Sequence, residues 1–149
     1  MAEAFHLAQV NVATFRKPKD DPANLDFMNA LDRVNGAAEK APGFVWRLKD
    51  ESGHSTNISF DPNPNRIVNL SIWEDMQSLM DFAYHQADHA AMLRRRDEWF
   101  DPGASQLALW WVRVGHRPDP AEAIARGRFL QKKGPTQKAF TFKDSFEPG

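Results

Sequence analysis

The sequence contains no cysteine and no long run of apolar residues. Without cysteine, the chain can form neither a disulfide nor a thiolate metal site, so its hydrophobic core must supply the stability alone. No stretch approaches the roughly 18 consecutive apolar residues of a membrane span, and residues 1–7 lack the pattern of a secretion signal. We therefore expect a soluble cytoplasmic protein that does not interact with membranes.

The chain also lacks an excess of charge of either sign. Nineteen basic and 20 acidic side chains leave a net charge of −1. Proteins that collect nucleic-acid phosphates need a positive field, which this balance does not supply. Nucleic acid is therefore not expected as a partner.

Residue periodicity predicts a mixed architecture within one domain that spans residues 1–149. Alternating apolar and polar residues predict four strands, at residues 7–13, 44–49, 66–73 and 107–114. Helical spacing and capping residues predict helices at residues 21–41, 74–100 and 119–133, with a break near 86–88 in the second. Turns are expected at 51–53 and 61–65, and Glu122 should reach back to the start of the last helix, as in a capping box.

This order of elements predicts an α+β fold of the ferredoxin-like βαββαβ type with an added C-terminal helix. Helices on one face of a four-stranded sheet would leave the other face uncovered and apolar. A second copy of the same sheet would cover it, which predicts a homodimeric α+β barrel. Residues 135–149 carry Phe140, Phe142 and Phe146, so this tail should dock on its own domain or on the partner.

One face of the predicted second helix combines aromatic, basic and apolar residues. At intervals of three or four residues it carries Phe82, His85, His89, Met92, Arg96 and Trp99. A core-facing stripe would be aliphatic, and a solvent-facing stripe would not hold Phe, Met and Trp, so the mixture indicates the wall of a ligand cavity. The alternative is that both histidines are structural.

The two histidines of this stripe are the candidates for proton transfer. Their spacing of four would let both bind one metal ion, but Gln86 stands where a metalloprotease helix carries its glutamate, and the spacing places no third ligand. We predict no metal. An imidazole titrates near neutral pH and can exchange a proton with an organic ligand. His85 or His89 is therefore the predicted acid/base.

Polar residues also lie within the first and third predicted strands. Asn11 belongs to the first strand, and Asn69, Ser71 and Trp73 share one face of the third. Buried amides and hydroxyls need partners, which are one another, a water or a ligand. We count Asn11 with the catalytic candidates, and Asn69, Ser71 and Trp73 with the substrate-binding ones.

The chain has five tryptophans, distributed over several predicted elements. Such a set is typical either of one large aromatic core or of an aromatic-lined pocket. On the second interpretation Trp46 and Trp111 join Trp73 and Trp99 among the substrate-binding residues.

Several segments resemble a known family, in this order along the chain: LAQVN at 7–11, GFVWR at 43–47, NLSIWE at 69–74, RRDEWF at 95–100, WW at 110–111, GHRP at 115–118 and GPTQKAFTF at 134–142. Together they are similar to a bacterial domain family of unknown function. That family is grouped with the dimeric α+β-barrel superfamily, which includes antibiotic-biosynthesis monooxygenases and haem-degrading monooxygenases.

The resemblance implies several functions. Cofactor-free monooxygenases of the superfamily hold a phenolic substrate among Trp, Asn and His side chains, which implies such a role for Asn11, Trp73 and one of the two histidines. Haem-degrading relatives use an asparagine, a tryptophan and an iron-binding histidine in the same order, so haem binding is the first alternative. A non-catalytic ligand carrier or dimeric interaction module is the second. The leading hypothesis is a cofactor-independent, monooxygenase-like enzyme acting on an aromatic or polycyclic substrate.

Overall fold

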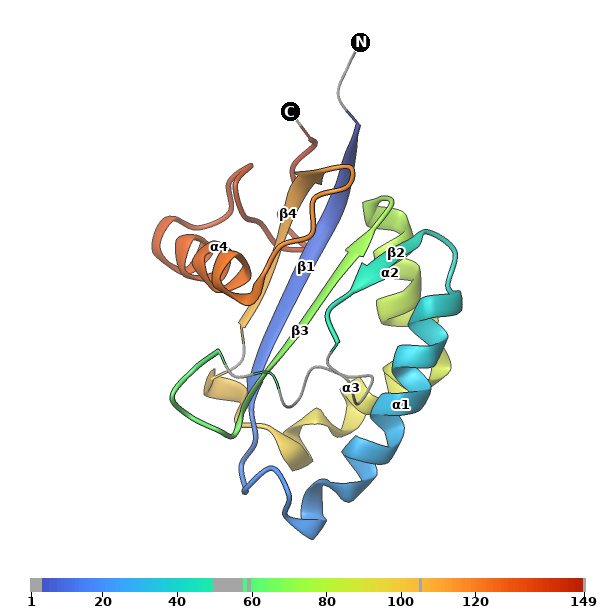
Figure 1. The fold of residues 1–149 in the computed structure, drawn as a ribbon, viewed down its shortest axis with the longest axis vertical. Helices are drawn as coiled ribbons and strands as arrows, with labels where there is room; N and C mark the ends of the chain where they lie inside the picture. Colours follow the sequence, from blue (N-terminus) through green and yellow to red (C-terminus); the bar gives the residue numbers. More distant parts are fainter. Residues whose placement is uncertain (1–3, 50–57, 59, 105, 149) are drawn as a thin grey trace.

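Four antiparallel strands form one sheet at the centre of the molecule (Figure 1). The computed structural model describes residues 4–49, 58, 60–104 and 106–148. The strands are β1 (Phe5–Thr14), β2 (Phe44–Arg47), β3 (Arg66–Trp73) and β4 (Gln106–Arg113), and they lie in the order β2-β3-β1-β4. This order confirms the predicted ferredoxin-like fold.

Four α-helices flank the sheet: α1 (Leu25–Lys40), α2 (Met76–His85), α3 (Ala87–Trp99) and α4 (Pro120–Lys133). The break expected near residues 86–88 lies at Gln86, whose backbone is extended and whose side chain accepts a hydrogen bond from His89 N at 2.7 Å. A side chain that caps the next helix in this way separates α2 from α3 without proline or glycine. His85 therefore ends one helix and His89 belongs to another.

The start of α4 differs in one respect from the sequence prediction. Asp119 caps the helix, because its side chain accepts from Glu122 N at 2.8 Å. The Glu122 carboxylate does not return to the cap, so the predicted capping box was wrong in this half. It accepts from Trp110 Nε1 at 3.3 Å and lies 2.7 Å from His116 Nε2, and so fastens α4 to the sheet.

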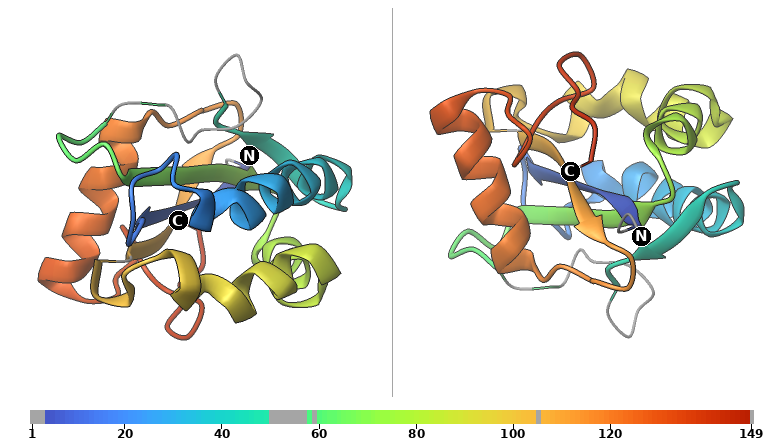
Figure 2. Two further views of the ribbon diagram at one scale, coloured as in Figure 1. Left: turned by 90° about the horizontal axis from the view of Figure 1, so that it is seen from below. Right: turned by 90° about the horizontal axis from the view of Figure 1, so that it is seen from above.

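The sheet lies between two helical layers (Figures 1 and 2). Helices α1, α2 and α3 cover the face that carries Leu7, Trp73 and Leu109, which we call the helical face. The opposite face carries Val10, Leu70 and other apolar side chains, and helix α4 covers it. We call it the α4 face. Cross-strand pairing assigns each strand residue to one face by its parity.

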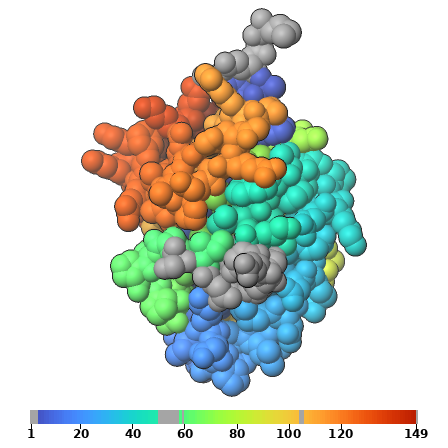
Figure 3. Space-filling model, in the orientation of Figure 1, coloured from blue at the N-terminus to red at the C-terminus, as the bar shows by residue number. Residues whose placement is uncertain are grey.

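The predicted uncovered sheet face is absent from the single chain, so this part of the prediction was wrong. Every apolar strand residue in the core of the α4 face is at most 6% exposed, and Ala123 of α4 is fully buried among them. Trp46, Leu48 and Phe60 pack against the same core. In Figure 3, the β4–α4 region (orange) lies against the region of β2 (teal) and against the segment before β3 (green) on the side turned toward the viewer. A second sheet is therefore not needed to bury the α4 face.

Strand β2 contains an irregularity that decides which of its side chains reach the helical face. The register shifts between Phe44, which pairs with Trp73, and Trp46, which pairs with Ile72. In a regular strand these two residues would share a face, but an extra residue reverses the parity. Phe44 therefore packs on the helical face and Trp46 on the α4 face.

The C-terminal tail packs against its own domain. Phe140 is fully buried and exchanges two backbone hydrogen bonds with Leu109 of β4, at 2.8 and 2.9 Å. Phe142 is partly buried on the same cluster, and Phe146 is 40% exposed.

The turn predicted at residues 51–53 lies outside the described residues. Within the described part of the chain, no helix has the length and apolar character to cross a membrane.

Candidate functional site

The middle of the helical face is polar, and part of it is open to solvent. Asn11 of β1 pairs with Asn69 of β3, and Gln9 pairs with Ser71. These strands are the two inner ones, where a face covered by helices is ordinarily apolar. Gln9 and Ser71 are each 7% exposed, whereas both asparagines are exposed. We call these four residues the polar centre.

Hydrogen bonds order part of the polar centre. Gln9 Nε2 donates to Asn69 Oδ1 at 2.7 Å and to Ser71 Oγ at 2.8 Å. Ser71 Oγ also accepts from Trp73 Nε1 at 2.9 Å, which fixes an indole that is only 1% exposed. The structure thus brings together Asn11, Asn69, Ser71 and Trp73, all of them predicted site residues. Gln9 is a further member that the sequence analysis did not include.

Apolar clusters lie on both sides of the polar centre along the strands. One contains Leu7, Trp73 and Leu109, and the other contains Phe15, Ile67 and Trp99. Met92 of α3 packs against both clusters. It therefore connects the two clusters on the helical side, and Met92 and the clusters together form the apolar wall beside the polar centre.

His89 stands next to this wall through a series of ring contacts. The Phe82 ring stacks on Trp73 and lies against the His89 ring, with centroids 5.2 Å apart in both cases. His89 Nδ1 lies 2.8 Å from the carbonyl oxygen of Ala83. Because a carbonyl can only accept, Nδ1 carries the proton in the neutral ring, and Nε2 keeps its lone pair.

Burial lowers the pKa of His89 below its ordinary value, and the hydrogen bond to Ala83 opposes this effect only in part. Removing an imidazolium from water is unfavourable, so the neutral form is favoured near pH 7. Nε2 has no hydrogen-bond partner among the described residues. A neutral imidazole with a free Nε2 is suited to act as a general base.

The other predicted site residues occupy different positions. His85 is exposed at the end of α2, Arg96 is exposed on α3, and Trp99 is buried in the Phe15 cluster. Trp46 lies on the α4 face, where the Arg117 guanidinium is 5.8 Å from the centre of its ring. Trp111 faces the helical side but donates Nε1–H to the Phe146 carbonyl at 2.6 Å, and so holds the tail.

Arg47 is a residue of this site that the sequence analysis missed. It pairs with Ser71 across β2 and β3, and Nη2 lies 3.3 Å from Glu39 of α1, so it is on the helical face. The sequence feature that could have identified Arg47 is a charged residue within a short, otherwise apolar strand. The bulge in β2, which sets its direction, has no marker in the sequence.

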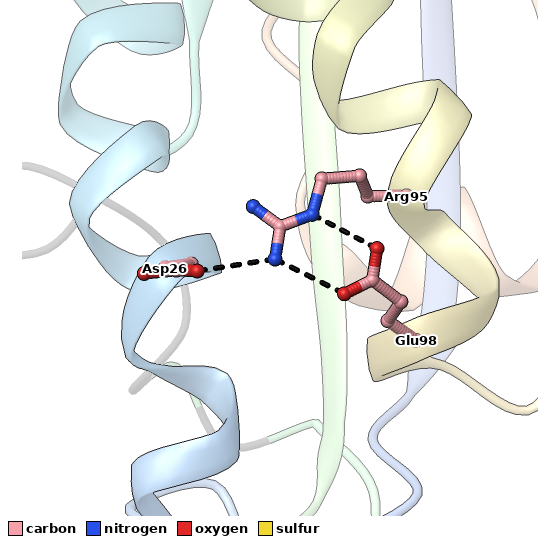
Figure 4. A network of polar contacts seen from close by, with 3 residues as sticks. All are labelled: Asp26, Arg95 and Glu98. Atoms are coloured by element: carbon pink, nitrogen blue, oxygen red, sulfur yellow. Dashed lines mark hydrogen bonds and ion pairs between the residues drawn. The ribbon is translucent and has the colours of Figure 1, made fainter.

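A cavity of about 360 Å³ lies between α1 and α3, and its lining includes Met92 and Trp99. At the edge of this cavity, the ion pair between Arg95 and Asp26 joins α3 to α1. Arg95 donates to both carboxylate oxygens of Glu98, at 2.9 and 3.0 Å, and to Asp26 Oδ2 at 3.1 Å (Figure 4). The lining residues belong to α1 and α3 and include none of the four residues of the polar centre.

Two observations bear on the metal and haem alternatives at the described residues. No group of three or more His, Asp or Glu side chains among them is arranged to hold a metal ion. A porphyrin between His89 and Trp73 would need the space that the Phe82 ring fills, since that ring contacts both. The arrangement at His89 therefore does not fit haem.

Solved structures with the same fold come from several microorganisms. The "Putative antibiotic biosynthesis monooxygenase" of Nitrosomonas europaea is 11% identical, with a TM-score of 0.55 over 78% of this chain and 98% of its own. A Shewanella oneidensis protein is 7% identical, with a TM-score of 0.55 over 74% and 93% of the two chains. At such identities the likeness concerns the fold alone.

A third structure carries a functional suggestion in its description. This Bacteroides thetaiotaomicron protein of unknown function, described as "Possible Oxidoreductase", is 12% identical, with a TM-score of 0.50 over 74% of this chain and 100% of its own. No curated protein matches the chain.

The family itself is defined over almost the whole sequence. The model of a domain of unknown function, DUF3291, matches residues 6–149. The match begins in β1 and runs through the tail, so it includes every element that builds the polar centre and its wall. The ferredoxin-like fold of the chain is shared with the solved structures described above, and the chain belongs to the DUF3291 family of domains.

Proposed function

We propose that this protein binds an aromatic or polycyclic small molecule over the polar centre and oxidises it with O₂ without a cofactor. The observation that carries the proposal is the exposure of Asn11 and Asn69 in the middle of a sheet face that helices otherwise cover. Two side-chain amides among aromatic and sulfur-containing side chains suit a flat ligand with polar substituents. The likeness to the Nitrosomonas protein is compatible with this reaction class.

In the proposed reaction His89 is the general base. Its free Nε2 takes a proton from an activated C–H of the ligand, and the resulting carbanion transfers electrons to O₂. One oxygen atom becomes a carbonyl on that carbon, and the other leaves as water with the two hydrogens of the former CH₂. Asn11 and Asn69 hold the ligand oxygens and Met92 provides apolar contact, while the buried Trp73 holds Ser71 in place through its indole N–H.

The test uses dithranol, a tricyclic anthrone that contains such a CH₂ group, and follows O₂ uptake and quinone formation above the rate without protein. Replacing Asn11 and Asn69 together with alanine should reduce kcat/KM at least about tenfold, because two hydrogen-bonding groups are lost. Gln77→Ala is the matched control, since it removes an exposed amide on α2 that bonds Asp81. His89→Gln should lower kcat, whereas His85→Gln should not.

The outcomes separate the alternatives. Equal activity of the wild type and the Asn11/Asn69 double variant would rule out the polar centre as the site. Binding of dithranol without O₂ uptake would contradict the oxygenase and assign the non-catalytic carrier instead.

A further inference from the structure

The hydrogen-bond donors of the polar centre and of the neighbouring Arg47 exceed the acceptors that the described residues supply to them. The Arg47 side chain is only 10% exposed, and its buried Nε has no hydrogen-bond partner among the described residues. A buried guanidinium that leaves a donor unpaired is costly unless another group satisfies it. Arg47 therefore requires an acceptor that the described chain does not provide.

Ser71, the cross-strand neighbour of Arg47, has the same requirement. Its Oγ already accepts two hydrogen bonds, from Gln9 Nε2 and Trp73 Nε1, which use both lone pairs. The hydroxyl proton remains to be donated, and no described residue receives it. Asn69 adds a third donor, because its Oδ1 accepts from Gln9 and its amide NH₂ has no partner among the described residues.

Among the described residues, the ion pairs at Arg47 leave an excess of positive charge. Glu39 is the one carboxylate that pairs with Arg47 among the described residues, and it is shared with Lys49, at 3.3 and 3.5 Å. Two cations thus face one anion. The pairing of Arg47 with Ser71 continues through the hydrogen bond from Leu48 N to Leu70 O. The same register places Lys49, two residues after Arg47, beside Asn69.

We propose that Arg47, Ser71 and Asn69 form a subsite for a carboxylate or similar planar oxyanion of the ligand. A guanidinium offers N–H donors in one plane, which matches two oxygens of a carboxylate. The inference rests on the proposed binding of an aromatic molecule and adds to it that the molecule is acidic. The bound anion would satisfy the donors of Arg47 and Ser71 together.

The experiment compares two probes that differ in one charge, 2-naphthoate and its neutral analogue 2-naphthamide, by calorimetric titration near neutral pH. The wild type should bind naphthoate about tenfold more tightly or better, as expected for a hydrogen bond to a charged group. Arg47→Met should abolish this preference, and Arg47→Lys should restore part of it, because it restores the charge without the planar donors.

Arg66→Met is the matched control. Among the residues that the structure describes, the buried Nε of Arg66 likewise has no partner, and Arg66 forms an ion pair with Asp61 at 3.2 Å. It pairs with Thr14 at the start of β3, which assigns it to the α4 face. The Arg66 variant should therefore keep the preference for naphthoate.

Each other outcome overturns the inference in a distinguishable way. Equal binding of both probes to the wild type would refute the oxyanion subsite and leave the aromatic site intact. If the preference for naphthoate survives Arg47→Met, Arg47 does not belong to the oxyanion subsite. If neither probe binds, both the subsite and the proposed function are refuted. The comparison of the two probes on the wild type tests the oxyanion subsite even if a variant does not fold.

Discussion

Ser71 shows how one small side chain organises the polar centre. Its hydroxyl receives the indole N–H of Trp73 and the amide of Gln9, two groups that are almost removed from water. An alanine here would leave the indole N–H of Trp73 and one of the two N–H groups of Gln9 Nε2 unsatisfied, each at a cost of about 1–3 kcal/mol, while Gln9 would keep its bond to Asn69. The same bonds free the hydroxyl proton for a ligand, so stability and binding depend on one atom.

His89 should make the stability of the protein depend on pH. Its pKa in the folded state lies below the ordinary value of 6.5 because of burial. The unfolded chain then binds more protons between these two pKa values, so this contribution is complete above about pH 6.5 and is lost as the pH falls through the folded pKa. Urea unfolding at a series of pH values should show a smaller decrease for His89→Gln than for the wild type.

The control for this prediction is His85→Gln, which removes an exposed histidine at the end of α2. It should follow the wild-type curve. An unchanged pH dependence in the His89 variant would contradict the inferred burial of a neutral imidazole.

At the scale of elements, the two C-terminal segments, α4 and the tail, cover one face of the sheet and the exposed edge of β4. Helix α4 covers one face through Ala123 and the Glu122–Trp110 hydrogen bond. The tail lies along β4 and places Phe140 in the same cluster as Trp73. The tail thus extends the apolar wall next to the polar centre.

Replacing Phe140 with alanine tests this role of the tail. The ring is fully buried, so the loss of its contacts and the resulting cavity should lower the free energy of unfolding by about 3–5 kcal/mol. Phe146→Ala is the control, because that ring is 40% exposed, and it should cost about 0.5 kcal/mol. Urea titration measures both. A loss for Phe140→Ala as small as the control's would show that the tail does not contribute to the core.

The whole molecule is a sheet between two helical layers, and this bears on its assembly. The homodimer remains a prediction, which rests on the family resemblance, since α4 occupies the face that a partner sheet was expected to cover. Sedimentation equilibrium at micromolar concentration should give twice the 17.0 kDa of the chain if the prediction holds. A mass of one chain would contradict it. Either way, the polar centre is assembled within a single chain.

The sequence by itself determined the order of strands and helices, the break near Gln86 and the polar character of Asn11, Asn69 and Ser71. These features follow from local periodicity, capping residues and turn residues, which act over a few residues along the chain. The ferredoxin-like class followed from that order.

Tertiary structure decided which side chains meet. The break between α2 and α3 left His85 in solvent and His89 against Phe82, and the β2 bulge turned Trp46 away and Arg47 toward Ser71. Helix α4 closed a face that the strand pattern alone left open. Such outcomes depend on contacts between residues distant in sequence and on a one-residue shift in pairing, which reverses the direction of side chains without changing the local pattern.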